Sequence, residues 1–197
     1  MQTQNIITDN GSQVNVGWIF WIQWILANGI PVFVVWAISL VVSINFILGM
    51  CILFGIFLGS LQWFILHRHV FWVTYHWILV TSISWIVGFF VAIALSLMLA
   101  GLDPTGNWSK LDVVKLTSIF GGLIGISIGL AQWFILSKHS YQTYWWVLVN
   151  SIGWAVGFGL GGYWLSSFDS FVVAGTIAGI ITGGPLIWLL RHQLTFT

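Results

Sequence analysis

Neutral polar side chains lie inside long apolar stretches of this sequence, and they are its main candidates for chemistry. Gln62 and Gln132 occupy the same place in two copies of the motif Gln-Trp-Phe-Ile-Leu. Asn28, Thr81 and Asn150 occupy equivalent places in three other apolar stretches. Amides and hydroxyls can hydrogen-bond a ligand or one another, but they stay uncharged near neutral pH and do not act as acids or bases there. The pattern therefore predicts binding or helix association.

Two interpretations of these groups remain open. In the first, they line a polar pocket that opens to the cytoplasmic side and is walled by nearby tryptophans. In the second, Gln62 faces Thr81 and Gln132 faces Asn150, in hydrogen bonds between neighbouring helices worth about 0.6–2 kcal/mol each. The full set of candidate ligand-binding residues is Asn28, Gln62, Trp63, Trp77, Thr81, Gln132, Trp133, Trp146 and Asn150.

The sequence lacks the side chains that other kinds of chemistry would need. No Asp, Glu, Lys or Arg falls inside a predicted membrane span, which argues against proton relays and ion-coupled carriers. The pattern contains no catalytic triad, no carboxylate cluster for a metal and no glycine-rich phosphate loop. We therefore expect no enzyme activity, no catalytic residue, no metal and no cofactor.

The histidines gather near the predicted inner face of the membrane. They are either interfacial residues beside basic anchors or ligands of a metal, haem or chlorophyll, for which His76 is the best candidate. The five are His67, His69, His76, His139 and His192.

Composition identifies the class of protein. The chain has 197 residues, of which 59% are hydrophobic and only 5% are charged, against roughly 25% charged in soluble domains. A net charge of +1 argues against nucleic-acid binding, and the single cysteine, Cys51, excludes a disulfide scaffold. We predict an all-α integral membrane protein.

The apolar stretches predict six transmembrane helices in one domain over 17–192, after a polar tail at 1–16. Pro31 is expected inside the first helix, with a turn at Ser43–Asn45. Ser109 and Asp112 have capping-box spacing, so the fourth helix is expected to start near Ser109, within an extracytoplasmic loop at 100–115. Asp169 and Ser170 are candidate N-caps of the sixth helix. The expected helices are 17–42, 46–66, 71–99, 116–137, 141–165 and 171–190.

Basic residues predict the orientation. Arg68, Lys138 and Arg191 each follow an even-numbered helix, whereas Lys110 and Lys115 lie on the other side. The positive-inside rule then predicts cytoplasmic N- and C-termini. Most of the 15 tryptophans lie toward the same basic side. They form an aromatic belt, or they wall a site for a flat ligand or a partner.

The sequence also repeats itself. The segment 59–69 matches 129–139, and a weaker copy starts at Gly184, with Ile187 in the place of the glutamines. We interpret this as tandem helical hairpins, with units at about 17–66, 71–137 and 141–190. Small residues at every fourth position predict close packing of the even helices. These rows are Cys51, Gly55 and Gly59; Gly121, Gly125 and Gly129; and Gly175, Gly179 and Gly183.

A resemblance rests on two repeated motifs. One is Gln-Trp-Phe-Ile-Leu followed by a basic residue, and the other is Ser-x-x-Trp-x-x-Gly at 82–88 and 151–157. Over about 46–165 the chain resembles uncharacterised Trp-rich polytopic membrane proteins of bacteria, notably cyanobacteria. The resemblance implies a repeat-built bundle in a bacterial cell or thylakoid membrane, and it carries over no catalytic residue.

Two functions follow as hypotheses. The first is a membrane subunit or scaffold that binds lipid, a hydrophobic ligand, a partner protein or a second copy of the chain. The second is a protein for small-molecule binding or passive transport, with its pocket between the hairpins. The direction of Asn28, Gln62, Gln132 and Asn150 distinguishes them: side chains around a water-reachable cavity favour the second, and side chains bonded to neighbouring helices favour the first.

Overall fold

The computed structural model describes residues 16–42, 47–70, 72–100, 108–139, 143–164 and 169–193. Six helices and no strand occur within these ranges. The predicted tail before residue 16 and the predicted turn at Ser43–Asn45 lie outside the described residues. The helices are α1 (Trp18–Val42), α2 (Ile47–His69), α3 (His76–Ala100), α4 (Lys110–Leu136), α5 (Trp145–Trp164) and α6 (Asp169–Gln193).

The observed boundaries fall close to the expected ones, and local chemistry explains the main differences. Pro31 lies inside α1, as predicted. The predicted capping box is confirmed, because Ser109 Oγ accepts from the Asp112 N–H and the Asp112 carboxylate accepts from the Ser109 N–H, both at 3.2 Å. Residues 110–115 of the predicted loop are therefore helical. α6 begins at Asp169, but the side chain of this candidate cap is outside the described part of the chain.

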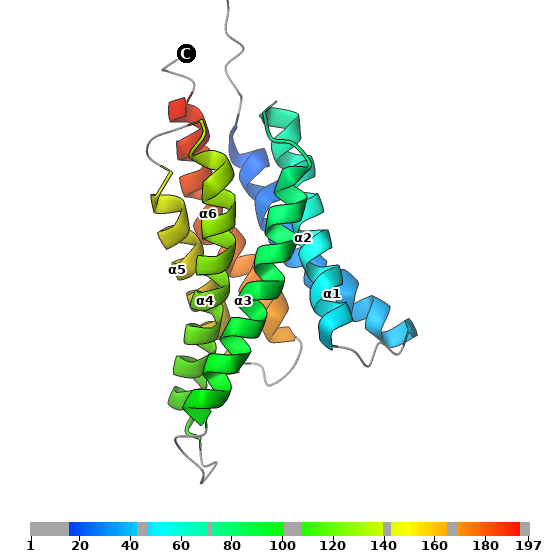
Figure 1. The fold of residues 1–197 in the computed structure, drawn as a ribbon, viewed down its shortest axis with the longest axis vertical. Coiled ribbons are helices and arrows are strands. Elements are labelled where there is room, and N and C mark those ends of the chain that lie inside the picture. Colours follow the sequence, from blue (N-terminus) through cyan, green and yellow to red (C-terminus); the bar gives the residue numbers. More distant parts are fainter. Residues whose placement is uncertain are drawn as a thin grey trace, which may run out of the picture.

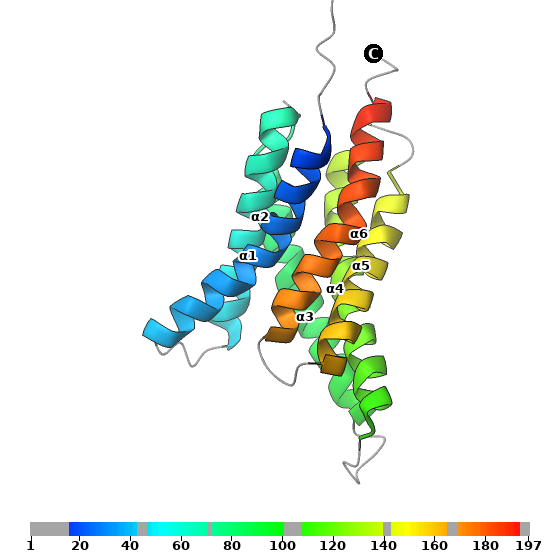
Figure 2. The same ribbon diagram turned by 180° about the vertical axis from the view of Figure 1, so that it is seen from behind.

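The helices form a closed ring. Each helix packs against its neighbours along the chain, and α6 returns to pack against α1. Figures 1 and 2 show that α2, α4 and α6 all end at the same end of the bundle, where α1, α3 and α5 begin. We call this the basic end, because Arg68, Lys138 and Arg191 lie there. Lys110 and Lys115 lie at the opposite end.

Five helices are long and apolar enough to cross a membrane, which is compatible with a multi-pass membrane protein. The helix outside this set is α5, whose 20 residues include Asn150, Tyr163 and several glycines that lower its mean hydropathy. The five are α1, α2, α3, α4 and α6.

The interior of the ring contains two apolar clusters. Near the basic end, Trp24, Trp77 and Trp146 pack with buried leucines of the even helices. Toward the opposite end, the core is more aromatic, with Phe54 against Trp85 at 4.2 Å between ring centroids. A layer of polar side chains lies among these residues, and it contains most of the predicted site.

Candidate functional site: a buried amide layer

Each even-numbered helix presents one inward stripe to the interior. Every fourth residue falls on about the same face of a helix, so a single stripe carries apolar residues and one polar group. Gln62, Gln132 and Thr182 are the polar members, and each is 3% exposed or less. The stripes are Phe54, Leu58, Gln62 and Leu66; Ile124, Ile128, Gln132 and Leu136; and Ala174, Ala178, Thr182 and Leu186.

Each odd-numbered helix contributes an indole to these polar groups. Trp77 Nε1 donates to Gln62 Oε1 at 3.2 Å, and Trp146 Nε1 donates to Gln132 Oε1 at 3.0 Å. Trp24 Nε1 donates to Thr182 Oγ1 at 2.9 Å. Each bond joins an odd helix to the even helix before it in the ring, including α1 to α6.

Amide groups then link these pairs to one another. Gln132 Nε2 donates to Gln62 Oε1 at 2.9 Å and to Thr81 Oγ1 at 3.0 Å. Gln62 Nε2 donates to Asn28 Oδ1 at 3.0 Å. Asn28 and Asn150 each donate to the backbone carbonyl one turn earlier, at 2.8 and 3.0 Å. The result is a network of hydrogen bonds that reaches all six helices.

The predicted pairing of these amides was wrong in detail. Gln62 bonds Asn28 rather than Thr81, and Gln132 bonds Thr81 rather than Asn150. The cause is that the indole of the following helix occupies the amide oxygen, so the amide N–H turns toward the preceding helix. Sequence spacing alone does not reveal this direction.

Glycines set the distance between the helices at this level. A Cβ on Gly59 would lie 3.1 Å from Ile78 Cα, and one on Gly129 would lie 2.8 Å from Val147 Cα. A Cβ on Gly129 would force the two backbones apart, and a Cβ on Gly59 would require its neighbour to move by a few tenths of an ångström, so glycine permits the approach at both positions.

Gly179 makes the corresponding approach in α6, where a Cβ would lie 2.8 Å from Ile25 Cα. Three residues beyond Gly59 and Gly129 are the two glutamines, and three residues beyond Gly179 is Thr182. The apolar residues after Gly184 instead predicted Ile187 in the register of the glutamines, and Thr182 was not predicted. The shared spacing of glycine and polar residue would have identified it.

Two predicted site residues lie outside the network. Trp63 and Trp133 are partly buried, and the buried indole N–H of Trp63 has no hydrogen-bond partner within the described ranges. The Trp63 ring stacks on His67, with 5.1 Å between centroids. The other seven residues, together with Trp24 and Thr182, form the layer.

The four histidines whose side chains the structure describes make local contacts near the basic end. His67 Nδ1 lies 3.1 Å from Val73 O, and His76 Nδ1 lies 2.8 Å from Thr74 Oγ1. The His139 ring stacks on Trp72 at 4.0 Å, and partial burial, with the charge of Lys138, lowers the pKa of His139 below its usual value. No group of three potential metal ligands occurs in the part of the chain that the structure describes.

The layer contains only neutral donors and acceptors, and its side chains are 0–4% exposed. Chemically, such an arrangement holds helices in register, since an unbonded amide inside the bundle would be costly. Comparison with known proteins found no matching family model, no matching curated protein and no matching solved structure.

Proposed function

We propose that this chain is a non-catalytic integral membrane scaffold in a bacterial cell or thylakoid membrane. Its internal polar groups hold the helices together, and its outer surface binds lipid, a hydrophobic ligand or a partner protein. The amide layer carries this proposal, because its amides donate to other helices or to their own backbone. Groups used in this way position the helices rather than a substrate.

The six helices, in this proposal, all cross the membrane. At 1.5 Å per residue, the 20 residues of α5 extend about 30 Å, which is the thickness of a bilayer core. With an even number of crossings, both termini lie on the side of Arg68, Lys138 and Arg191. The positive-inside rule makes that side the cytoplasm.

We also propose that the bundle arose from three copies of a two-helix unit. Matched backbone approaches support this origin: a Cβ on Gly55 would lie 3.0 Å from Ser82 Cα, and one on Gly125 would lie 2.7 Å from Ser151 Cα. In the third seam, a Cβ on Gly175 would lie 3.5 Å from the α carbon of the next glycine, in α1. With hairpin units at about 17–66, 71–137 and 141–190, these three seams are the contacts between one unit and the next around the ring.

The outer surface supports a lipid environment. Large apolar side chains are exposed on every helix, as lipid contact requires. Aromatic residues with polar groups are exposed at the basic end, where they fit the headgroup level of a bilayer. They are Trp18, Tyr75, Tyr144, Trp145 and Trp188.

A pocket for small molecules or passive transport is the alternative function. It needs the amides of Gln62 and Gln132 to face water or a ligand. Both amides instead bond protein groups and are buried. We therefore favour the scaffold.

A double variant tests the proposal. Gln62→Ala with Gln132→Ala leaves two indole N–H groups and the Asn28 Oδ1 without partners, so we expect a loss of about 2–4 kcal/mol in unfolding free energy. Stability is measured by denaturation in detergent, with Gln23→Ala, in the surface groove between α1 and α2, as the control. Unchanged stability, together with loss of small-molecule binding or permeation, would favour the pocket.

The topology has its own test. In a Cys51→Ala background, Lys110→Cys is expected to react with an impermeant maleimide added outside intact cells. Ser137→Cys, beside Lys138, is expected to react only after the membrane is opened. Labelling of both sites from one side would contradict the proposed crossings.

A further inference from the structure

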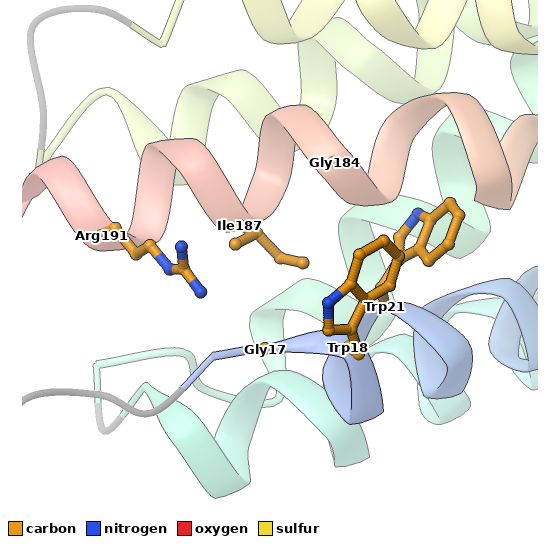
Figure 3. Close-up of a pocket in the computed structure, with 6 residues that line it drawn as sticks. All are labelled: Gly17, Trp18, Trp21, Gly184, Ile187 and Arg191. Atoms are coloured by element: carbon orange, nitrogen blue, oxygen red, sulfur yellow. The ribbon is translucent and has the colours of Figure 1, made fainter.

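A groove of about 350 Å³ opens on the outer surface at the basic end, between the start of α1 and the last turns of α6. Figure 3 shows the Arg191 guanidinium at one side of this groove and two indoles at the other, with Ile187 between them. Its volume is within the range of small-ligand sites. The lining residues are Gly17, Trp18, Trp21, Gly184, Ile187 and Arg191.

The polar side of the groove is a fixed cation. Arg191 Nε and Nη2 both donate to Val16 O, at 3.1 and 2.6 Å, which holds the guanidinium in place. These bonds use two of its five N–H groups, and guanidinium N–H groups favour the oxygens of phosphate. Among the described residues, no carboxylate lines the groove, and the Lys115–Asp112 ion pair lies at the opposite end of the bundle. The Arg191 guanidinium therefore has N–H groups and a positive charge with which it can bind an anion.

The remainder of the groove is apolar and open. No atom of the described residues lies within 4 Å of the position that a Cβ on Gly184 would take, so the floor of the groove is open there. Trp21 Nε1 donates to Ile180 O at 3.2 Å, which fixes its ring as a wall. Trp18 is 76% exposed and lies where headgroups are expected. This shape accepts a hydrocarbon chain next to a phosphate.

We propose that this groove binds one anionic phospholipid. Its phosphate lies on Arg191, and an acyl chain runs over Gly184 and Ile187 toward Trp21. A zwitterionic headgroup would bring a second cation beside Arg191 with no carboxylate to meet it, so the anionic class is preferred. The proposal rests on the proposed function, because it needs the chain to lie in a membrane, and it deepens it by naming the lipid and its site.

Another basic residue at the same end supplies a matched control. Lys138 Nζ lies over the Phe134 ring, 4.9 Å from its centroid, and does not line this groove. Lys138→Gln removes the same charge as Arg191→Gln from the same end of the bundle. A difference in lipid binding between these two variants is therefore due to the groove and not to the general attraction of anionic lipid to positive charge.

The experiment is native mass spectrometry of the purified full chain in detergent, titrated with phosphatidylglycerol or phosphatidylcholine of identical acyl chains. We expect the wild type to prefer phosphatidylglycerol about tenfold. Arg191→Gln should abolish this preference, and Lys138→Gln should retain it. Gly184→Phe, whose Cβ would have open space around it, should fill the groove with its ring and weaken the binding of both lipids.

Three results would overturn the lipid site. They are a phosphatidylglycerol preference that survives Arg191→Gln, lipid binding that is unchanged in Gly184→Phe, and displacement of the lipid by millimolar inorganic phosphate. The last result would identify a soluble oxyanion as the ligand. Arg191→Gln could unfold because it loses its bonds to Val16. Gly184→Phe keeps those bonds, so its lipid binding then tests whether the groove is the lipid site.

Failure of this site differs from failure of the proposed function. The lipid site alone would be contradicted by three results together. The protein would resist extraction with alkaline carbonate, it would lose stability when Gln62 and Gln132 are replaced, and it would show no lipid preference. Release of the chain by carbonate would contradict membrane integration itself.

Discussion

The ring has a tightly packed side and a loosely packed side. Between α4 and α5, a Cβ on Gly125 would lie 2.5 Å from Asn150 O, so the two backbones are in contact. Between α1 and α2, the position that holds Gly88 in α3 and Gly157 in α5 holds Val35, a larger residue that is buried in the apolar cluster toward the opposite end. Backbone distance in this bundle follows the size of the residue at each seam.

The loose side is also where α1 departs from the ring. Figures 1 and 2 show the later part of α1 running away from α6. A surface groove beside Arg68 lies between α1 and α2, on this loose side. The groove beside Arg191 lies instead where the start of α1 meets α6. The two sides show that helix backbones approach each other where small residues line a seam and stay apart where larger residues do.

The largest effect is expected from a methyl group in the tight seam. Gly125→Ala places a Cβ against the backbone of α5, and the two helices must separate. We expect a loss of about 3 kcal/mol or more in unfolding free energy, or failure to fold. Gly122→Ala is the control, since its Cβ would meet its nearest neighbours at an ordinary 3.6 Å. Equal stability of the two variants would contradict the tight packing of α4 against α5.

The indole bonds of α5 and α1 should differ in how much they stabilise the fold. Trp146→Phe leaves the Gln132 oxygen without its indole donor, and we expect a cost of about 1–3 kcal/mol. Trp24→Phe should cost less, because Thr182 still donates to Ala178 O at 2.7 Å and needs no second partner. Chemical denaturation of both variants measures the difference. A larger loss of unfolding free energy for Trp24→Phe than for Trp146→Phe would contradict this prediction.

Hydrogen exchange should separate the two sides directly. Around Pro31 the helix lacks one backbone N–H bond and has a loosely packed neighbour, so local opening costs less there. We expect amides of α1 after Pro31 to exchange at least about tenfold faster than those at 121–129 of α4. Mass spectrometry of deuterated peptides resolves both segments. Equal exchange rates in the two segments would show that the looser packing of α1 does not make its backbone open more readily.

The smallest effect concerns His139, which stacks on Trp72 at the tight side. Partial burial and Lys138 lower its pKa, so NMR of the ring should show titration at a lower pH than in a peptide. Because the folded chain binds this proton less readily than the unfolded chain, stability should fall slightly as pH drops through the usual imidazole range and below it. Lys138→Gln should raise the pKa, and no change would assign the shift to burial alone.

Local patterns were sufficient to predict the helices, the cap at Ser109 and the place of Pro31, because each depends on residues near in sequence. They also identified the amides that point inward. The partners of those amides could not be predicted, because they depend on the order of helices around the ring and on its closure. Thr182 was missed because similarity of the apolar residues after Gly184 outweighed the spacing from Gly179.

Closure of α6 onto α1 removes any structural distinction between a first and a last helix. The start of α1 and the end of α6 lie at the same end of the bundle. A short linker from Gln193 to Trp18, with the chain cut between α2 and α3, would keep every seam and every hydrogen bond of the amide layer. Such a circularly permuted chain should fold to the same bundle, with its new termini still at the basic end.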